Sequence, residues 1–132
     1  MICYPTGRPD AFYTIPNSVT IIRANAFELC SNLKTITIPD SVTSIETEAF
    51  RDCSNLKYIN IPKSATDIKP FAFIGCSSLK EIHNNSIIPQ EITSDCFSEV
   101  DMEACISYVP KGSYDAYKNA EGWKECINII EE

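Results

Sequence analysis

Three cysteines recur at intervals of 23 residues, each at the start of a nearly identical pentapeptide. Cys30 and Cys53 both begin the sequence CSNLK, and Cys76 begins CSSLK. A thiolate is a nucleophile and a soft metal ligand, so a regular series of thiols could be reactive or could bind metal. The alternative is a small apolar side chain that each repeat buries once.

The spacing favours burial. Successive parallel strands lie about 4.8 Å apart, which places three equivalent thiols in a line at about that interval. Two sulfurs on one zinc ion lie at most about 4.6 Å apart, so the outer two thiols cannot share an ion. Parallel Cα–Cβ bonds keep neighbouring Cβ atoms farther apart than the ~3.5–4.5 Å of a disulfide. We therefore predict that Cys30, Cys53 and Cys76 are buried, reduced and free of metal.

The remaining cysteines are Cys3, Cys96, Cys105 and Cys126. Seven cysteines leave at least one thiol unpaired in a monomer. Cys96, Cys105 and Cys126 lie outside the repeated series, and a disulfide between two of them stays open.

No other group of residues predicts catalysis. His83 is the single histidine, and a Cys–His nucleophile pair must approach to about 3 Å. The repeat places His83 on a strand and Cys76 in the turn before it, so we interpret His83 as a solvated strand residue. The carboxylates are spread over the chain and form no calcium loop. We predict no enzymatic activity, no cofactor and no metal.

Composition limits the classes of partner. The 132 residues fit a single domain, and their net charge of −7 opposes binding to nucleic acid and to anionic lipid. No apolar run approaches the ~20 residues of a membrane helix, so the segment is not expected to insert into a membrane. The first ten residues, MICYPTGRPD, lack the apolar core of a secretory signal.

The chain is built on a 23-residue repeat. Twelve of the 23 positions are identical in three consecutive rows, which run over residues 15–37, 38–60 and 61–83. A period of this length predicts a solenoid, in which each row forms one coil and the coils bury one another's apolar faces.

Each row predicts a strand followed by an irregular arc. Leu33, Ile36 and Ile38 follow the L-x-x-L-x-L rhythm of a leucine-rich repeat, so successive strands form a parallel sheet on one side. Val42 and Ile45 are expected to point inward on the opposite arc. The stretch TEAFRDC, residues 47–53, could form one helical turn. The predicted class is α/β, a short right-handed leucine-rich-repeat solenoid.

The two ends depart from the repeat. Residues 1–14 predict an abbreviated first coil that lacks a polar cap, which suggests a longer protein. Residues 84–132 predict a degenerate repeat and a C-terminal cap, with Ile92 and Phe97 in register. Ser113 is placed to cap a short helix. The residues expected to plug the last coil are Trp123, Tyr114 and Tyr117. Asn84-Asn85-Ser86 also matches the N-glycosylation pattern.

The motif I-P-x-S-V-T-x-I-x-x-x-A-F-x-x-C-S-x-L-K-x-I recurs between Ile15 and Ile82. It resembles the BspA-like leucine-rich repeat family of bacterial surface proteins, and residues 108–132 look like the segment that closes such arrays. The resemblance implies a cell-surface or extracellular location and a role in adhesion through exposed residues. Ser107 departs from the family, which has an apolar residue there, so the pairing of the last strand is less certain.

The alternation within each strand leaves one residue set on the outer face of the sheet. This candidate binding face consists of Phe12, Thr14, Thr35, Thr37, Tyr58, Asn60, Glu81 and His83. Phe12 and Tyr58 favour a binding role, because the core does not need aromatic residues there. Tyr and Thr also simply suit strand surfaces.

Two functions stay open. One is a noncatalytic, monomeric module that binds a protein or glycan, such as host extracellular matrix. The other is a structural stalk or cap segment without a ligand.

Overall fold

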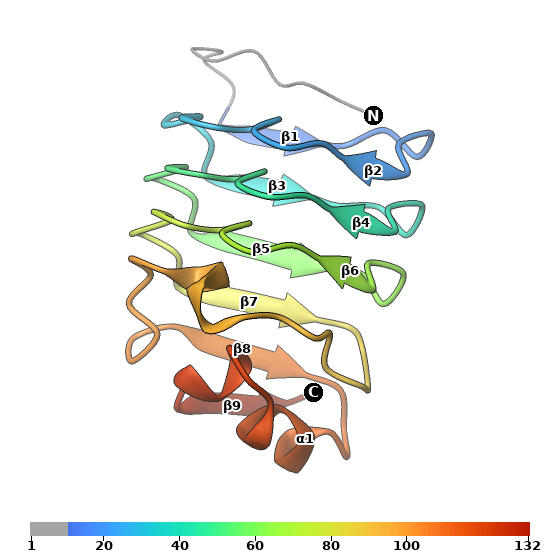
Figure 1. Cartoon of the computed structure of the whole chain (residues 1–132), viewed down its shortest axis with the longest axis vertical. Helices are drawn as coiled ribbons and strands as arrows, with labels where there is room; N and C mark the ends of the chain where they lie inside the picture. Colours follow the sequence, from blue (N-terminus) through green and yellow to red (C-terminus); the bar gives the residue numbers. More distant parts are fainter. Residues whose placement is uncertain (1–10) are drawn as a thin grey trace.

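The computed structural model describes residues 11–132 and shows a short solenoid of stacked coils (Figure 1). Its main layer is a six-stranded parallel sheet. In spatial order the strands are β1 (Phe12–Thr14), β3 (Thr35–Thr37), β5 (Tyr58–Ile61), β7 (Glu81–Asn84), β8 (Ile106–Val109) and β9 (Asn128–Glu131). The predicted abbreviated coil at residues 1–14 and Cys3 lie outside the described residues, apart from positions 11–14.

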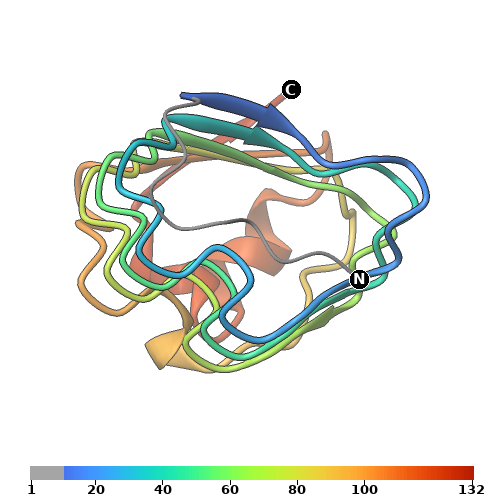
Figure 2. The ribbon, with the colours of Figure 1, turned by 90° about the horizontal axis from the view of Figure 1, so that it is seen from above.

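The register of the sheet follows the 23-residue period. Ile36 of β3 pairs with Ile59 of β5, which pairs with Ile82 of β7. These isoleucines are fully buried, and so are Val42 and Ile45 on the opposite arc, as predicted. Each coil therefore buries the same positions against the coils above and below it, and Figure 2 shows the coils following one outline.

The opposite arc contains a second sheet that the sequence did not predict. Its three short parallel strands are β2 (Ile21–Ile22), β4 (Ser44–Ile45) and β6 (Asp67–Ile68), in that order. The helical turn expected at residues 47–53 does not form. Glu48 and Asp52 have φ values of 57° and 56°, and left-handed residues at these two places interrupt a right-handed helix. Isolated turns carry the chain around this side instead.

A stack of aromatic rings runs through the core along the solenoid axis. Phe27, Phe50 and Phe73 occupy the same position in successive coils, with ring centroids 5.0 and 5.2 Å apart and nearly parallel planes. Phe97 continues the stack at 5.2 Å from Phe73, which confirms the predicted register of the fourth row. The ring of Trp123 closes it at 5.4 Å from Phe97.

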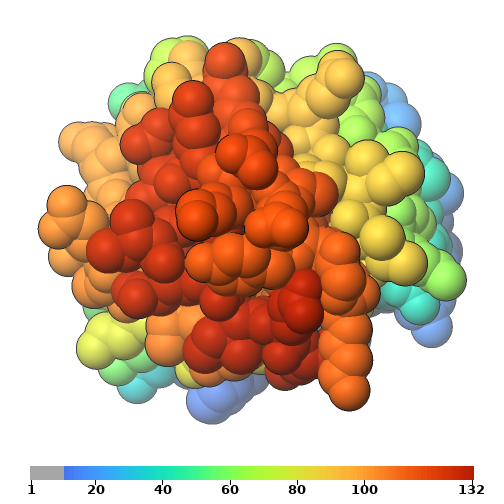
Figure 3. All heavy atoms as spheres, turned by 90° about the horizontal axis from the view of Figure 1, so that it is seen from below, coloured from blue at the N-terminus to red at the C-terminus, as the bar shows by residue number. Residues whose placement is uncertain are grey.

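The C-terminal segment covers the last coil (Figure 3). It contains α1 (Tyr114–Asn119) and η2 (Trp123–Glu125), whereas the 3₁₀ helix η1 (Ser94–Phe97) belongs to the fourth coil. Trp123 and Tyr117 are buried as predicted, with rings packed edge to face. Tyr114 does not join this plug: it lies at the first position of α1, is 37% exposed, and its ring lies under the Lys118 ammonium.

The helix α1 is capped differently from the prediction. Ser113 is the residue that precedes it, but its hydroxyl donates to the Pro110 carbonyl rather than to a helix amide. The backbone amides of Gly112 and Tyr114 instead donate to the Glu131 carboxylate, each at 2.9 Å. A negatively charged carboxylate at a helix N-terminus also interacts favourably with the positive end of the helix dipole. The cap of α1 therefore comes from β9.

Ser107 pairs with Ile82 in the sheet, so the strand β8 forms despite the polar residue. Its hydroxyl is the one buried side-chain oxygen or nitrogen without a hydrogen-bond partner in the described part of the chain.

Replacing Ser107 by alanine removes this unsatisfied group, and we expect the substitution to raise the unfolding free energy by about 1 kcal/mol. Thermal unfolding should show a Tm higher by roughly 4 °C. A lower Tm would mean that the hydroxyl is satisfied.

Candidate functional site on the face of the six-stranded sheet

All eight predicted face residues lie on the outer side of the six-stranded sheet. Its backbone pairs Phe12 with Thr35, Thr35 with Tyr58, and Tyr58 with Glu81. A second row pairs Thr14 with Thr37 and Asn60 with His83. Phe12 is 73% exposed, Thr14 and Thr37 are exposed, and the other five are half-buried. We call this surface the sheet face.

Three rings are in contact across its C-terminal half, the first pair tilted by 35° and the second pair stacked within 10°. The Tyr58 ring centroid lies 4.6 Å from that of His83, and the His83 centroid lies 4.3 Å from that of Tyr108 on β8. Tyr108 was not among the residues predicted for this face, although Tyr108-Val109-Pro110 repeats the strand-end pattern of Asn60-Ile61-Pro62. That shared proline is the signal that would have aligned it.

His83 is not the solvated residue that the sequence indicated, because its side chain is only 20% exposed and both ring nitrogens have carboxylate partners. Nε2 lies 3.0 Å from Glu81 Oε1, and Nδ1 lies 3.0 Å from Glu132 Oε1. A neutral imidazole has one N–H, so both contacts are hydrogen bonds to ionised carboxylates only when both nitrogens carry protons. The imidazole thereby ties the β7 strand to the residue that follows β9.

The two carboxylates also act on Tyr58. Partial burial raises the pKa of the Tyr58 hydroxyl above its usual range, and the negative charges of Glu81 and Glu132 raise it further. The phenol therefore stays protonated and can donate a hydrogen bond on the sheet face.

Asn60 has a structural role that its place on the face does not reveal. Backbone pairing between β3 and β5 ends at Ile36 and Ile59. Beyond it, Asn60 Nδ2 donates to the Ile38 carbonyl at 2.9 Å, and the Ile38 amide donates to Asn60 Oδ1 at 3.0 Å. The side-chain amide thus replaces the next step of the backbone ladder, and Asn60 has little capacity left for a ligand.

The predicted thiol series is buried in the core, as expected. Cys53 Sγ donates to the Phe27 carbonyl at 3.0 Å and Cys76 Sγ to the Phe50 carbonyl at 3.2 Å, so each thiol bonds to the preceding coil. The hydrogen bond with Cys53, together with burial, raises the pKa of Cys30. The pKa of Cys53 is lowered by its bond with Cys30 but raised more by Cys76 and by burial. Cys30 and Cys53 are therefore weak nucleophiles.

The other described cysteines are also buried free thiols, so the disulfide left open among Cys96, Cys105 and Cys126 is not formed in this structure. Burial is the main cause that raises the pKa of Cys96, and likewise that of Cys105, to about 12. Cys126 Sγ donates to the Cys105 carbonyl at 3.0 Å. Cys96 occupies the position of Ala49 and Ala72 in the earlier coils: its carbonyl accepts from the amide of Phe73, as theirs accept from Phe27 and Phe50.

Cys76 and His83 do not form a nucleophile–base pair. The Cys76 thiol is fully buried and bonded to a carbonyl, whereas His83 is held by carboxylates on the sheet face.

Asn84 of the glycosylation pattern is 2% exposed and exchanges two hydrogen bonds with Gln90, at 2.8 and 3.2 Å. Its amide is therefore inaccessible to modification in the folded chain.

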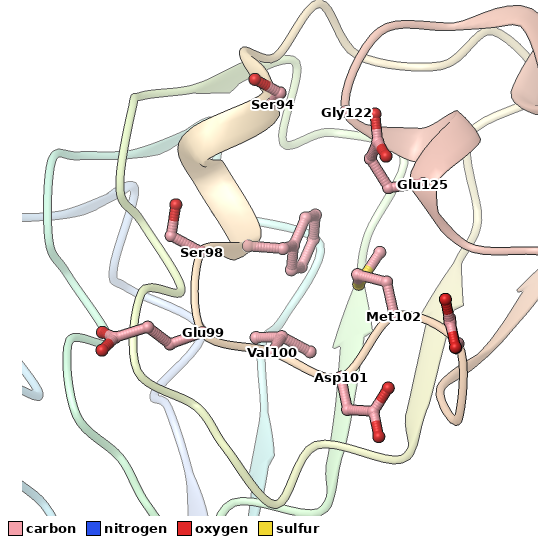
Figure 4. Close-up of a pocket in the computed structure, with 10 residues that line it drawn as sticks. Ser94, Ser98, Glu99, Val100, Asp101, Met102, Gly122 and Glu125 are labelled. Carbon is pink, nitrogen blue, oxygen red and sulfur yellow. The ribbon is translucent and has the colours of Figure 1, made fainter.

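A separate hollow of about 590 Å³ lies at the junction of η1 and the cap. Phe97, Val100 and Met102 contribute apolar surface to it, and Figure 4 shows Val100 and Met102 near its middle. The carboxylates around it are Glu99, Asp101, Glu103 and Glu125. Within residues 11–132, however, no three or more His, Cys, Asp or Glu side chains are grouped so that they could hold a metal ion. None of the eight predicted face residues lines this hollow.

Among the same described residues, no helix has the length and apolar character needed to cross a membrane.

Solved structures share this architecture. A leucine-rich repeat protein from Eubacterium ventriosum superposes with a TM-score of 0.69 at 23% identity, over 97% of this chain and 34% of that one. A leucine rich cell surface protein from Faecalibacterium prausnitzii gives 0.68 at 28% identity, over 98% and 34%. The pneumococcal vaccine antigen PcpA gives 0.64 at 18% identity, over 98% and 43%. The chain thus spans less than half the length of each structure.

No curated protein sequence matches the chain. Six copies of the repeat described as the BspA type leucine rich repeat region match residues 11–120. That match covers the coils, the fourth degenerate row and the helix α1, and it agrees with the buried positions found in each coil. The chain belongs to the BspA-type leucine-rich repeat family.

Proposed function

We propose that the chain is a noncatalytic binding or adhesion module of a larger bacterial surface protein, and that its sheet face binds a protein or glycan. The observation that carries the proposal is the aromatic content of that face. Phe12 is 73% exposed there, and Tyr58 and Tyr108 both pack against the His83 ring. Exposed aromatic side chains that lose little freedom on binding favour recognition.

The likeness to a leucine rich cell surface protein supports a location at the cell surface or outside the cell. The partner class includes host extracellular matrix, and the module acts as a monomer. The Tyr58 hydroxyl, held protonated by partial burial and by the neighbouring carboxylates, is an ordered donor on the face, which suits a partner with exposed carbonyl or hydroxyl groups.

The second candidate is a structural stalk or cap segment without a ligand. The specific observation in its favour is that several face residues already satisfy one another. Asn60 bonds to the neighbouring backbone, and His83 is held between Glu81 and Glu132. A face that exists only to hold coils together would be built in this way.

Replacement of Phe12 and Tyr58 by serine distinguishes a binding module from a structural stalk. The double variant should lose binding to any extracellular-matrix protein or glycan that the wild-type chain binds on an array. Phe12→Ser alone should leave Tm unchanged, because the ring is exposed. Tyr58→Ser should cost about 1 kcal/mol, because it removes the stack on His83. Absence of any wild-type ligand on the array would favour the stalk.

A further inference from the structure

A column of lysines lies along the sheet where its strands begin. Lys34, Lys57 and Lys80 directly precede β3, β5 and β7, and all three side chains are exposed. The Lys57 amide donates to the Lys34 carbonyl at 2.9 Å and the Lys80 amide to the Lys57 carbonyl at 3.0 Å. They are therefore consecutive steps of one backbone ladder, about 4.8 Å apart. We call them the lysine stripe.

The stripe lysines lack ion-pair partners among the described residues, whereas three other cations of this acidic chain have them. Arg23 pairs with Glu46 at 3.2 Å, Arg51 with three carboxylates, and Lys69 with Asp67 at 3.1 Å. In the part of the chain that the structure describes, no carboxylate lies within ion-pair distance of the three stripe lysines. Like charges stacked at this interval repel one another, so the column does not stabilise the fold by itself.

The residues around the stripe are mostly polar, and one of them, Glu81, carries a carboxylate. In each repeat a buried leucine directly precedes the lysine, and the residues directly before these leucines are Asn32, Asn55 and Ser78. On the other side, the carboxylate next to Lys80 is that of Glu81, which is turned to the His83 ring at 3.0 Å. The stripe therefore presents three positive charges beside amide and hydroxyl groups, without an apolar centre of the kind that protein interfaces use.

We propose that the lysine stripe binds a linear acidic polysaccharide, which carries sulfate or carboxylate groups at regular intervals along its chain. The ammonium groups neutralise those anions one after another along the stripe. The stripe is one side chain wide and runs across the strands, so it fits a narrow chain laid along the solenoid axis. This site uses none of the sheet-face residues and stands without the function proposed above.

Nucleic acid fits the same charges less well. The net charge of −7 repels every polyanion, and a duplex most strongly, because its phosphates place one charge per ~1.7 Å of helix axis. Proteins that bind single strands also offer aromatic faces on which bases stack. Tyr58, His83 and Tyr108 contact one another, which leaves Phe12, among the described residues, as the single exposed ring beside the stripe rather than a row of free stacking faces. An acidic polysaccharide needs no such faces.

The test compares two triple variants on immobilised dextran sulfate, with uncharged dextran as the blank. Lys34→Gln/Lys57→Gln/Lys80→Gln removes the stripe. Its matched control changes three exposed lysines elsewhere, Lys63→Gln/Lys111→Gln/Lys124→Gln, and loses the same charge. The logarithm of the affinity falls with the logarithm of the salt concentration, with a slope of about 0.7 per neutralised charge. For three charges we expect the affinity of the wild type to fall roughly 20-fold between 50 and 200 mM salt. The stripe variant should bind at least about tenfold more weakly, and the control should match the wild type.

Equal losses in the two variants would overturn the proposal, because the binding would then follow net charge alone. Failure of the wild-type chain to bind dextran sulfate at low salt would also overturn it. Tighter binding to single-stranded oligodeoxythymidine than to dextran sulfate would overturn the ligand class. Thermal unfolding of both variants confirms that the fold is retained, and the Phe12 and Tyr58 variants of the sheet face should bind dextran sulfate normally.

Discussion

Replacing Phe50 by alanine is expected to lower the free energy of unfolding by about 3–5 kcal/mol. The ring is fully buried and lies between Phe27 and Phe73, with centroids 5.0 and 5.2 Å away. Its loss leaves a cavity at the centre of the stack, and both neighbours lose a stacking partner. Because coils of a solenoid contact only adjacent coils, the damage also uncouples the two halves of the molecule. Urea denaturation followed by far-UV circular dichroism measures the effect.

Phe12→Ala serves as the matched control, since it deletes the same atoms from a ring that is 73% exposed. We expect this variant to lie within about 0.5 kcal/mol of the wild type. A Phe50→Ala variant with near-wild-type stability would show that the stack does not hold the coils together. A broad or two-step transition would agree with the account, because the upstream and downstream coils would then unfold separately.

Gly122→Ala is expected to destabilise the cap by about 2–4 kcal/mol. Gly122 has a φ of 79°, a conformation that side chains with a Cβ adopt with strain. An added Cβ would also lie 2.6 Å from Cγ1 of the buried Ile92 and 3.0 Å from the carbonyl oxygen of Thr93. The backbone carbonyl cannot move away easily, and Trp123 follows directly, so the strain displaces the ring that closes the stack. Thermal unfolding and Trp123 fluorescence report the change.

Gly112→Ala isolates the conformational part of that effect. Gly112 has a φ of 87°, but nothing lies within 4 Å of an added Cβ. It should cost only about 1 kcal/mol. Equal stabilities for the two variants would contradict the close packing of Gly122 against Ile92. A Gly122→Ala variant with unchanged Trp123 fluorescence would contradict the link between this turn and the plug.

The repeated positions made most of the fold predictable. Ile36, Ile59 and Ile82 recur at a fixed period, so their burial and the parallel register follow from the sequence. The turns between strands were not predictable in the same way. Asn25, Glu48 and Phe71 share a left-handed conformation although their side chains have little in common, because the stacked backbone imposes it. The second sheet depends on those turns and was missed with them.

The sheet face was predictable as an alignment but not in its contacts. Period two along each strand places Tyr58 and His83 outside, and the structure agrees. The partners that fix them come from outside the repeat: Tyr108 lies in the degenerate row and Glu132 follows the last strand. No spacing rule brings Glu132 to His83, because the path of the cap decides it. The role of Asn60 was hidden for a related reason, since its amide acts only where backbone pairing stops.

The central claim is that the sheet face, and not exposed apolar surface in general, binds the partner. The most direct test measures the affinity of three proteins for one array-selected ligand: the wild type, Phe12→Ser/Tyr58→Ser, and a control, Leu29→Ser/Ile88→Ser. The control removes two large side chains that are 53% and 79% exposed but lie off the sheet face. We expect the first variant to lose binding and the control to keep wild-type affinity. Loss in the control with retention in the sheet-face variant would contradict the claim.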